Sequence, residues 1–216
     1  MHTELINQLS EIGIVPVVVI EDEAHALELG KALMESGLRC AEVTFRTKAA
    51  AGAIKILTDN YPELIVGAGT VLTKEQADSA INAGSKFIVS PGLNPSVVTY
   101  CQEKGVPVVP GVMTPSEIEQ AMSLGLTTVK FFPAEAAGGV KMLKALSAPY
   151  AGIKFMPTGG IDAKNVTDYL ALKNVFCCGG SWMVKKEMIA AGEFDKIKEM
   201  AQEAVEIVKS VRNGGK

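Results

Sequence analysis

The sequence predicts an α/β fold, a single (β/α)₈ barrel with a short N-terminal helix, in one domain that spans residues 1–216. Eight β-branched or aromatic segments alternate with eight helical patterns, as expected when each strand is followed by a crossover helix. Several helical patterns end at a glycine just before the next strand, which gives a quasi-repeat of roughly 20 residues. The chain has 216 residues and no linker-like segment, which fits one small barrel.

The individual elements follow from composition and from helix-ending signals. Residues 4–11 form a short amphipathic lead, and the acidic run 21–23 separates the first strand from the first helix. That helix ends at Gly37, because glycine accepts the left-handed conformation that follows many helices. The same signal recurs at Gly84, Gly105 and Gly125. The expected strands are residues 14–20, 40–45, 64–67, 87–90, 106–109, 128–132, 154–156 and 175–178. The expected helices are residues 24–36, 49–60, 74–83, 95–104, 115–124, 140–147, 165–172 and 193–212.

Charge and hydropathy exclude several classes of protein. The net charge is −3 with no basic block, so no surface for nucleic acid is expected. The longest apolar run, residues 12–20, is too short to cross a bilayer and contains Gly13 and Pro16. The first residues lack the basic and apolar regions of a secretory signal. We therefore expect a cytoplasmic protein without membrane contact.

Cysteine and histidine usage argues against a metal centre. The four cysteines show no Cys-x-x-Cys spacing, and Cys177 and Cys178 are adjacent, so we interpret them as small buried residues. His2 and His25 are the only histidines. A Ser-His-Asp triad or a histidine-rich zinc site is therefore not expected, and we predict no metal and no cofactor.

Lys130 stands inside the expected strand 128–132. An ammonium group loses its hydration in a buried strand, so a lysine is disfavoured there unless it is paired or neutral. A neutral amine that faces a pocket can attack a carbonyl carbon and form a Schiff base. The alternative is a lysine near a strand end whose amine reaches solvent and does no chemistry.

Polar side chains at the end of the second and third strands favour the chemical interpretation. Glu42, Thr44 and Arg46 occupy alternate positions, so they share one face of a strand and point into the barrel. A glutamate beside an amine nucleophile can move protons, whereas Arg46 can hold a carboxylate and Thr70 can add a hydroxyl group. An ion pair of Glu42 with Lys130 or Arg46 that merely fills the barrel remains the structural alternative.

Glycine pairs follow the seventh and eighth strands. Gly159 and Gly160 come after Thr158, and Gly180 precedes Ser181. In barrels of this type the loops after these two strands often bind phosphate through backbone N–H groups, and glycine lets the backbone approach the anion. Each pair alone is also compatible with a plain turn. Together they predict a phosphate site.

Two further residues complete the candidate substrate site. Phe131 and Phe132 face opposite ways in a strand, so one is expected to pack in the core, and we place Phe132 at the pocket. Pro91 stands in the junction after the fourth strand, where its ring would stiffen the strand exit beside the substrate.

Taken together, these junctions resemble the 2-keto-3-deoxy-6-phosphogluconate (KDPG) aldolase family, which also includes 4-hydroxy-2-oxoglutarate (KHG) aldolase. The resemblance spans nearly the whole chain in order. It is carried by the segments Glu42-Val43-Thr44-Phe45-Arg46-Thr47, Gly67-Ala68-Gly69-Thr70-Val71, Ser90-Pro91-Gly92, Lys130-Phe131-Phe132-Pro133-Ala134-Glu135, Pro157-Thr158-Gly159-Gly160-Ile161 and Gly179-Gly180-Ser181-Trp182.

The resemblance implies a metal-independent class I aldolase that assembles as a homotrimer. It assigns Lys130 as the Schiff-base lysine and Glu42 as the general acid and base. It also implies that Arg46 and Thr70 hold the pyruvate carboxylate. The distal phosphate would lie at the two glycine loops, with Gly159, Gly160 and Ser181 in contact and Thr158 nearby.

The expected reaction is reversible cleavage of KDPG to pyruvate and glyceraldehyde 3-phosphate, a step of Entner-Doudoroff carbohydrate metabolism. Cleavage of KHG to pyruvate and glyoxylate is expected as a second activity, and a preference for KHG or for the 6-phosphogalactonate epimer is the nearest alternative. A metal-dependent phosphosugar epimerase would need His and Asp ligands at strand ends, which the sequence lacks. An inactive trimeric barrel that serves as a scaffold is the alternative outside enzymes.

Overall fold

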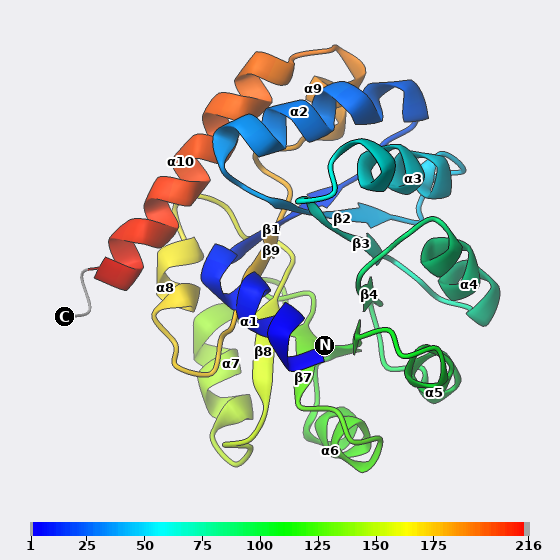
Figure 1. Cartoon of the computed structure of the whole chain (residues 1–216). Coiled ribbons are helices and arrows are strands. Elements are labelled where there is room, and N and C mark those ends of the chain that lie inside the picture. The colour runs from blue at the N-terminus through cyan, green and yellow to red at the C-terminus, as the bar shows by residue number, and fades with distance from the viewer. Residues whose placement is uncertain (1, 214–216) are drawn as a thin grey trace.

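Parallel strands curl into a ring in the computed structural model, which describes residues 2–213 (Figure 1). This arrangement confirms the predicted barrel. The strands are β1 (Ile14–Val18), β2 (Cys40–Thr44), β3 (Ile65–Gly69), β4 (Ile88–Val89), β5 (Val108–Val109), β6 (Gly111–Val112), β7 (Thr128–Phe131), β8 (Lys154–Pro157) and β9 (Cys178–Gly180). The hydrogen-bonded orders are β5-β4-β3-β2-β1-β9 and β6-β7-β8.

Two junctions join these sheets into one ring. Pro110 alone separates β5 from β6, because proline has no N–H to donate to a ladder. On the other side, parallel bridges pair Phe155 with Val175 and Thr158 with Gly179. The expected strand 106–109 therefore continues beyond Pro110, and β5 with β6 counts as one of the eight barrel strands.

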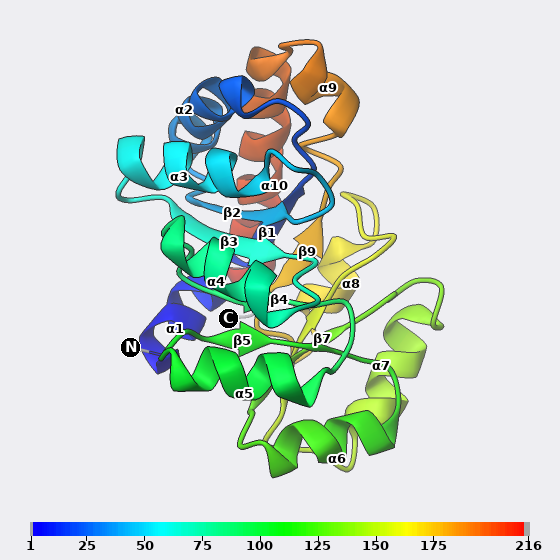
Figure 2. The same ribbon diagram turned by 90° about the vertical axis from the view of Figure 1, so that its right-hand side faces the viewer.

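Helices surround the ring in both views (Figures 1 and 2). They are α1 (His2–Ile12), α2 (Ala26–Ser36), α3 (Ala50–Asn60), α4 (Lys74–Asn82), α5 (Pro95–Glu103), α6 (Pro115–Ser123), α7 (Gly139–Ser147), α8 (Val166–Leu170), α9 (Lys186–Ala190) and α10 (Phe194–Asn213), and a 3₁₀ helix, η1 (Glu23–His25), precedes α2. The expected N-terminal helix is α1. Helix α9 was not predicted, and the predicted helix 165–172 is shorter in the structure, where it forms α8.

The barrel has an outer and an inner apolar layer. Side chains such as Val43, Val129 and Phe131 lie between the strands and the helices. A separate apolar cluster lies inside the barrel, toward the end where the strands begin. Its buried members are Leu9, Val15, Cys40, Phe87, Val89, Val109, Met156, Phe176 and Cys177. Leu9 comes from α1 and has no exposed surface, so α1 closes the end of the barrel where the strands begin (Figure 2).

The inner cluster leaves the opposite end of the bore to polar groups. Glu42, Thr44 and Lys130 are all buried. Along β2, Glu42 and Thr44 lie beyond the inner residue Cys40 toward the carboxyl end, and Lys130 pairs in register with Met156 of β8. Within residues 2–213, no helix combines the length and apolar character that a membrane span requires.

Candidate active site

Lys130 and Glu42 face each other inside the barrel. Val129 and Phe131 pack outward against the helices, so the alternation of β7 directs Lys130 inward. Its Nζ lies 3.7 Å from Glu42 Oε1, and the two residues are 4% and 0% exposed. The Lys130 backbone N–H donates to the carbonyl of Pro110 at 2.8 Å, which holds β7 beside the strand formed by β5 and β6. The amine is therefore held dry and close to a carboxylate.

The Glu42 carboxylate has room only because Gly69 lies beside it. A Cβ at Gly69 would lie 2.1 Å from Glu42 Oε1. Within the described part of the chain, neither carboxylate oxygen has a hydrogen-bond partner, although burial of an unsatisfied carboxylate is costly. Both oxygens are thus free to bond to a substrate hydroxyl group or a water molecule.

Phe132 links the buried amine to an open cavity. Lys130 Nζ lies 5.0 Å from the centre of the Phe132 ring, a distance typical of a cation–π contact. Phe132 also lines the cavity described below, whereas Phe131 has no exposed surface. Phe131 therefore packs in the core and Phe132 faces the cavity, whereas a role of Phe132 in substrate binding stays a prediction.

Arg46 and Thr70 contact each other at the carboxyl ends of β2 and β3. Arg46 Nε donates to Thr70 Oγ1 at 3.3 Å. Thr70 has φ of 56°, a left-handed conformation that β-branched residues rarely adopt and that often marks a functional site. Thr44, the third polar residue of the predicted face, instead donates to the carbonyl of Val18 at 2.9 Å, so it ties β2 to β1.

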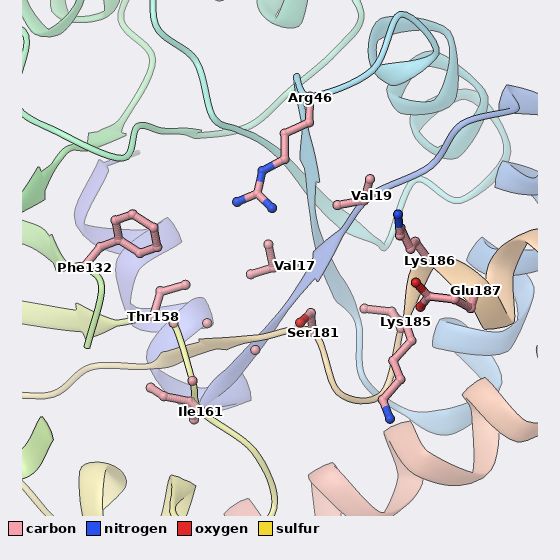
Figure 3. Close-up of a pocket in the computed structure, with 15 residues that line it drawn as sticks. Val17, Val19, Arg46, Phe132, Thr158, Ile161, Ser181, Lys185, Lys186 and Glu187 are labelled. Carbon is pink, nitrogen blue, oxygen red and sulfur yellow. The ribbon is translucent and has the colours of Figure 1, made fainter. Parts of the chain in front are cut away.

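The cavity has a volume of about 300 Å³ and opens at the carboxyl ends of β1, β8 and β9 (Figure 3). Figure 3 shows the Arg46 guanidinium group directed toward the space between Phe132 and Val17. Of the candidate residues, those that line it are Arg46, Phe132, Thr158, Gly159, Gly160, Gly180 and Ser181. Lys130, Glu42 and Thr70 do not line it, but Lys130 contacts the lining residue Phe132 and Thr70 accepts a hydrogen bond from the lining residue Arg46. Pro91 does not line it, and its carbonyl packs where a Cβ of Gly111 would be.

The Gly159–Gly160 loop has its carbonyl groups turned away from the cavity. Thr158 O and Gly159 O accept from the backbone N–H groups of Ala134 and Glu135 at 2.8 and 3.0 Å, and Gly160 O accepts from Asn165 Nδ2 at 3.0 Å. A trans peptide places its N–H opposite its C=O. The N–H groups of Gly160 and Ile161 therefore point to the cavity side, as an anion-binding loop requires.

Two lysines at this end were missed by sequence reasoning. Lys185 and Lys186 line the cavity together with Glu187, all at the start of α9. In Figure 3, Lys186 lies on the Val19 side of the cavity, whereas Lys185 extends away from it. The signal was present in the sequence, since a Lys-Lys pair follows the Gly-Gly-Ser loop by only a few residues.

The described residues 2–213 contain no group of three or more His, Cys, Asp or Glu side chains placed to hold a metal ion. What the site does contain is an amine beside a carboxylate, an arginine fork and a loop that presents N–H groups. This set suits a substrate with a carbonyl carbon and two anionic ends.

Comparison with known proteins gives concordant matches. The family model described as KDPG and KHG aldolase matches residues 5–200. A 2-dehydro-3-deoxy-phosphogluconate aldolase of Haemophilus influenzae is 48% identical over 206 residues, which cover 95% of this chain and 97% of that protein.

Solved structures match equally well. The KDPG aldolase of Legionella pneumophila, determined with pyruvate captured as a covalent carbinolamine intermediate, has a TM-score of 0.88 and 39% identity over 92% of this chain and 97% of its own. The 2-keto-3-deoxy-6-phosphogluconate aldolase of Zymomonas mobilis, determined with 3-phosphoglycerate, has a TM-score of 0.86 and 38% identity over 93% and 94% of the respective chains.

Proposed function

The chain belongs to the KDPG and KHG aldolase family and is a class I, Schiff-base aldolase, and from this premise we propose that its site cleaves KDPG reversibly to pyruvate and glyceraldehyde 3-phosphate. The observation that carries the proposal is the buried Lys130–Glu42 pair, 3.7 Å apart beside an open cavity. A desolvated amine and a buried carboxylate beside it are the two groups that this chemistry needs.

The mechanism assigns one role to each member of the pair. Lys130 Nζ attacks C2 of the keto acid, and loss of water gives an iminium ion that withdraws electrons from C3. Glu42 takes the proton of the C4 hydroxyl group as the C3–C4 bond breaks, which releases the aldehyde and leaves an enamine. Protonation at C3 and addition of water then release pyruvate and restore the free amine.

The positions of the two ends of the substrate are also proposals, and the geometry around the pair supports them. Arg46 and Thr70 are proposed to hold the carboxylate next to C2, because the arginine fork can form two parallel hydrogen bonds with it. The loops at Gly159–Gly160 and Gly180–Ser181 are proposed to bind the phosphate, with Thr158 beside them. The Zymomonas relative described with 3-phosphoglycerate supports an anion of this kind in the family.

KHG is proposed as a second substrate, since the family model covers both activities. It shares the reacting keto acid with KDPG but carries no phosphate. Rates measured with KDPG, its galactonate epimer and KHG will rank the three substrates. A kcat/KM for KDPG below that for KHG would assign the chain to KHG instead.

Covalent trapping tests the catalytic assignment directly. Incubation with pyruvate and borohydride, followed by peptide mass analysis, is expected to modify Lys130 and to inactivate the enzyme. Lys130→Arg should abolish both the modification and turnover. Lys154→Arg is the matched control, because Lys154 lies on neighbouring β8 with an exposed side chain whose amine donates to the carbonyl of Lys173 at 3.1 Å. Modification at another lysine, or activity of Lys130→Arg, would overturn the assignment.

We also propose that residues 1–216 form one domain and assemble as a cytoplasmic homotrimer, as the resemblance of the motifs to the family implies. Light scattering in solution should then give a mass three times the 22.8 kDa of one chain. A monomeric mass would contradict the trimer, and recovery of the protein in a membrane or secreted fraction would contradict the location.

A further inference from the structure

Glu135 supports the Gly159–Gly160 loop from outside the cavity. It lies in the segment between β7 and α7, and its backbone N–H donates to Gly159 O at 3.0 Å. A Cβ on Gly160 would lie 2.7 Å from Glu135 Cβ, so the loop backbone rests directly on the Glu135 stem. Any movement of Glu135 would therefore be transmitted to the peptide groups of Gly159 and Gly160.

Tyr169 in turn fixes the Glu135 side chain. The Tyr169 hydroxyl group donates a hydrogen bond to Glu135 Oε1. Glu135 itself is exposed, and an exposed glutamate side chain normally samples several rotamers. Tyr169 has no exposed surface and belongs to the core between the barrel and the helices. An anchored core residue thus holds a surface carboxylate in one position.

The surroundings of this hydrogen bond are built to accept it. A Cβ on Gly139 would lie 3.1 Å from Glu135 Oε1 and 3.3 Å from the Tyr169 hydroxyl oxygen, so a larger residue there would press on both groups of the hydrogen bond. Burial, together with the Glu135 carboxylate, raises the pKa of Tyr169. The hydroxyl group therefore keeps its proton, and remains a donor, throughout the neutral range.

We propose that Glu135 and Tyr169 are positioning residues for the substrate phosphate, which they serve by holding the N–H groups of Gly160 and Ile161 toward the cavity. The ligand class, a phosphorylated sugar acid, rests on the proposed function. Neither residue lines the cavity, so both act through the loop. The proposal predicts that the hydrogen bond between Tyr169 and Glu135 strengthens the binding of phosphorylated substrates and has little effect on substrates without phosphate.

Tyr169→Phe tests this role, because the change removes the hydroxyl group and keeps the buried ring. Loss of one hydrogen bond should weaken phosphate binding by about threefold to tenfold. Glu135→Ala should have the same effect. Glu135→Gln is the matched control, since its amide oxygen can still accept from Tyr169, and it should stay within about twofold of the wild type. In the double variant Tyr169→Phe/Glu135→Ala the loss should not exceed that of a single variant.

Three measurements separate positioning from general damage. The Kd for inorganic phosphate, followed by ³¹P NMR titration, should rise in Tyr169→Phe. The KM for KDPG should rise with kcat nearly constant. The kcat/KM for KHG should stay within about twofold, as should the rate of pyruvate trapping by borohydride.

An unchanged phosphate Kd and KM for KDPG in Tyr169→Phe would overturn the proposal, and so would equal losses on KDPG and KHG. Failure of the proposed function appears separately, as absence of pyruvate trapping in the wild type. The phosphate titration does not depend on turnover, so the two failures remain distinguishable.

Discussion

Gly69→Ala tests whether the position of the Glu42 carboxylate controls the rate. The added Cβ would lie 2.1 Å from Glu42 Oε1 and 2.7 Å from its Cδ and Cγ. An ordinary contact begins at 3.4 Å, so the carboxylate oxygen must retreat by 1.3 Å, the difference between 3.4 and 2.1 Å. The backbone at Gly69 does not have positive φ, so alanine fits the strand conformation itself. The substitution therefore acts on the carboxylate.

The expected result is a loss of kcat on the order of 100-fold, because a displacement of about 1 Å can cost that much in rate. Overpacking beside Glu42 should also lower the free energy of unfolding by about 1–3 kcal/mol. Steady-state kinetics with KDPG and thermal unfolding measure the two effects. Pyruvate trapping at Lys130 should persist, since the amine is retained.

Gly152→Ala is the matched control. No atom lies within 4 Å of a Cβ built at Gly152, so both kcat and stability should remain at wild-type values. A Gly69→Ala variant that folds and keeps the wild-type kcat would refute the reasoning, because the carboxylate would then tolerate displacement without catalytic loss.

Three further outcomes are expected. Burial raises the pKa of Cys101 to about 11, and all four free cysteines are buried. A thiol reagent at pH 8 should therefore modify the native protein very slowly, whereas it should modify all four thiols after denaturation. Rapid modification of the native protein would contradict the structure. Lys186→Gln should raise the KM for phosphorylated substrates by about twofold to threefold at low salt, with a smaller effect at high salt. The control Lys55→Gln on α3 should leave this KM unchanged. An effect of Lys186→Gln that does not depend on salt would rule out a charge-based role. The hydrogen bond from Lys198 lowers the pKa of Glu35, so this pair stabilises the fold above the ordinary carboxyl range and loses its effect as the pH falls through the lowered pKa. Thermal unfolding of Lys198→Met should accordingly differ from the wild type at neutral pH and converge with it in acid, and a constant difference would contradict the linkage.

The sequence predicted the barrel because its signals are local. Strand composition and terminal glycines such as Gly37 and Gly125 act within one element, and both glycines have the expected positive φ. The partners inside the barrel were harder to predict. Thr44 shared the predicted polar face with Glu42, yet it donates to the carbonyl of Val18, because a buried hydroxyl group takes whichever acceptor the neighbouring strand offers.

Features that depend on contacts between distant residues were not predictable from the sequence. The hydrogen bond between Glu135 and Tyr169 joins residues 34 positions apart, and no periodicity connects them. The left-handed conformation of Thr70 contradicts its local propensity and is maintained by its surroundings. Lys185 and Lys186 were visible as a charged pair, but their place at the cavity depends on how α9 turns back after β9.

The helix α1 covers the end of the barrel at which the strands begin. Leu9 and the apolar side chains of the inner cluster are buried and fill that end of the bore, so we expect substrates and products to reach Lys130 through the opposite end. In the proposed site the keto-acid half is attached to Lys130 at depth, and the phosphorylated half lies between it and the solvent. This proposal implies an ordered reaction, in which glyceraldehyde 3-phosphate departs before pyruvate in cleavage and pyruvate enters first in the reverse direction.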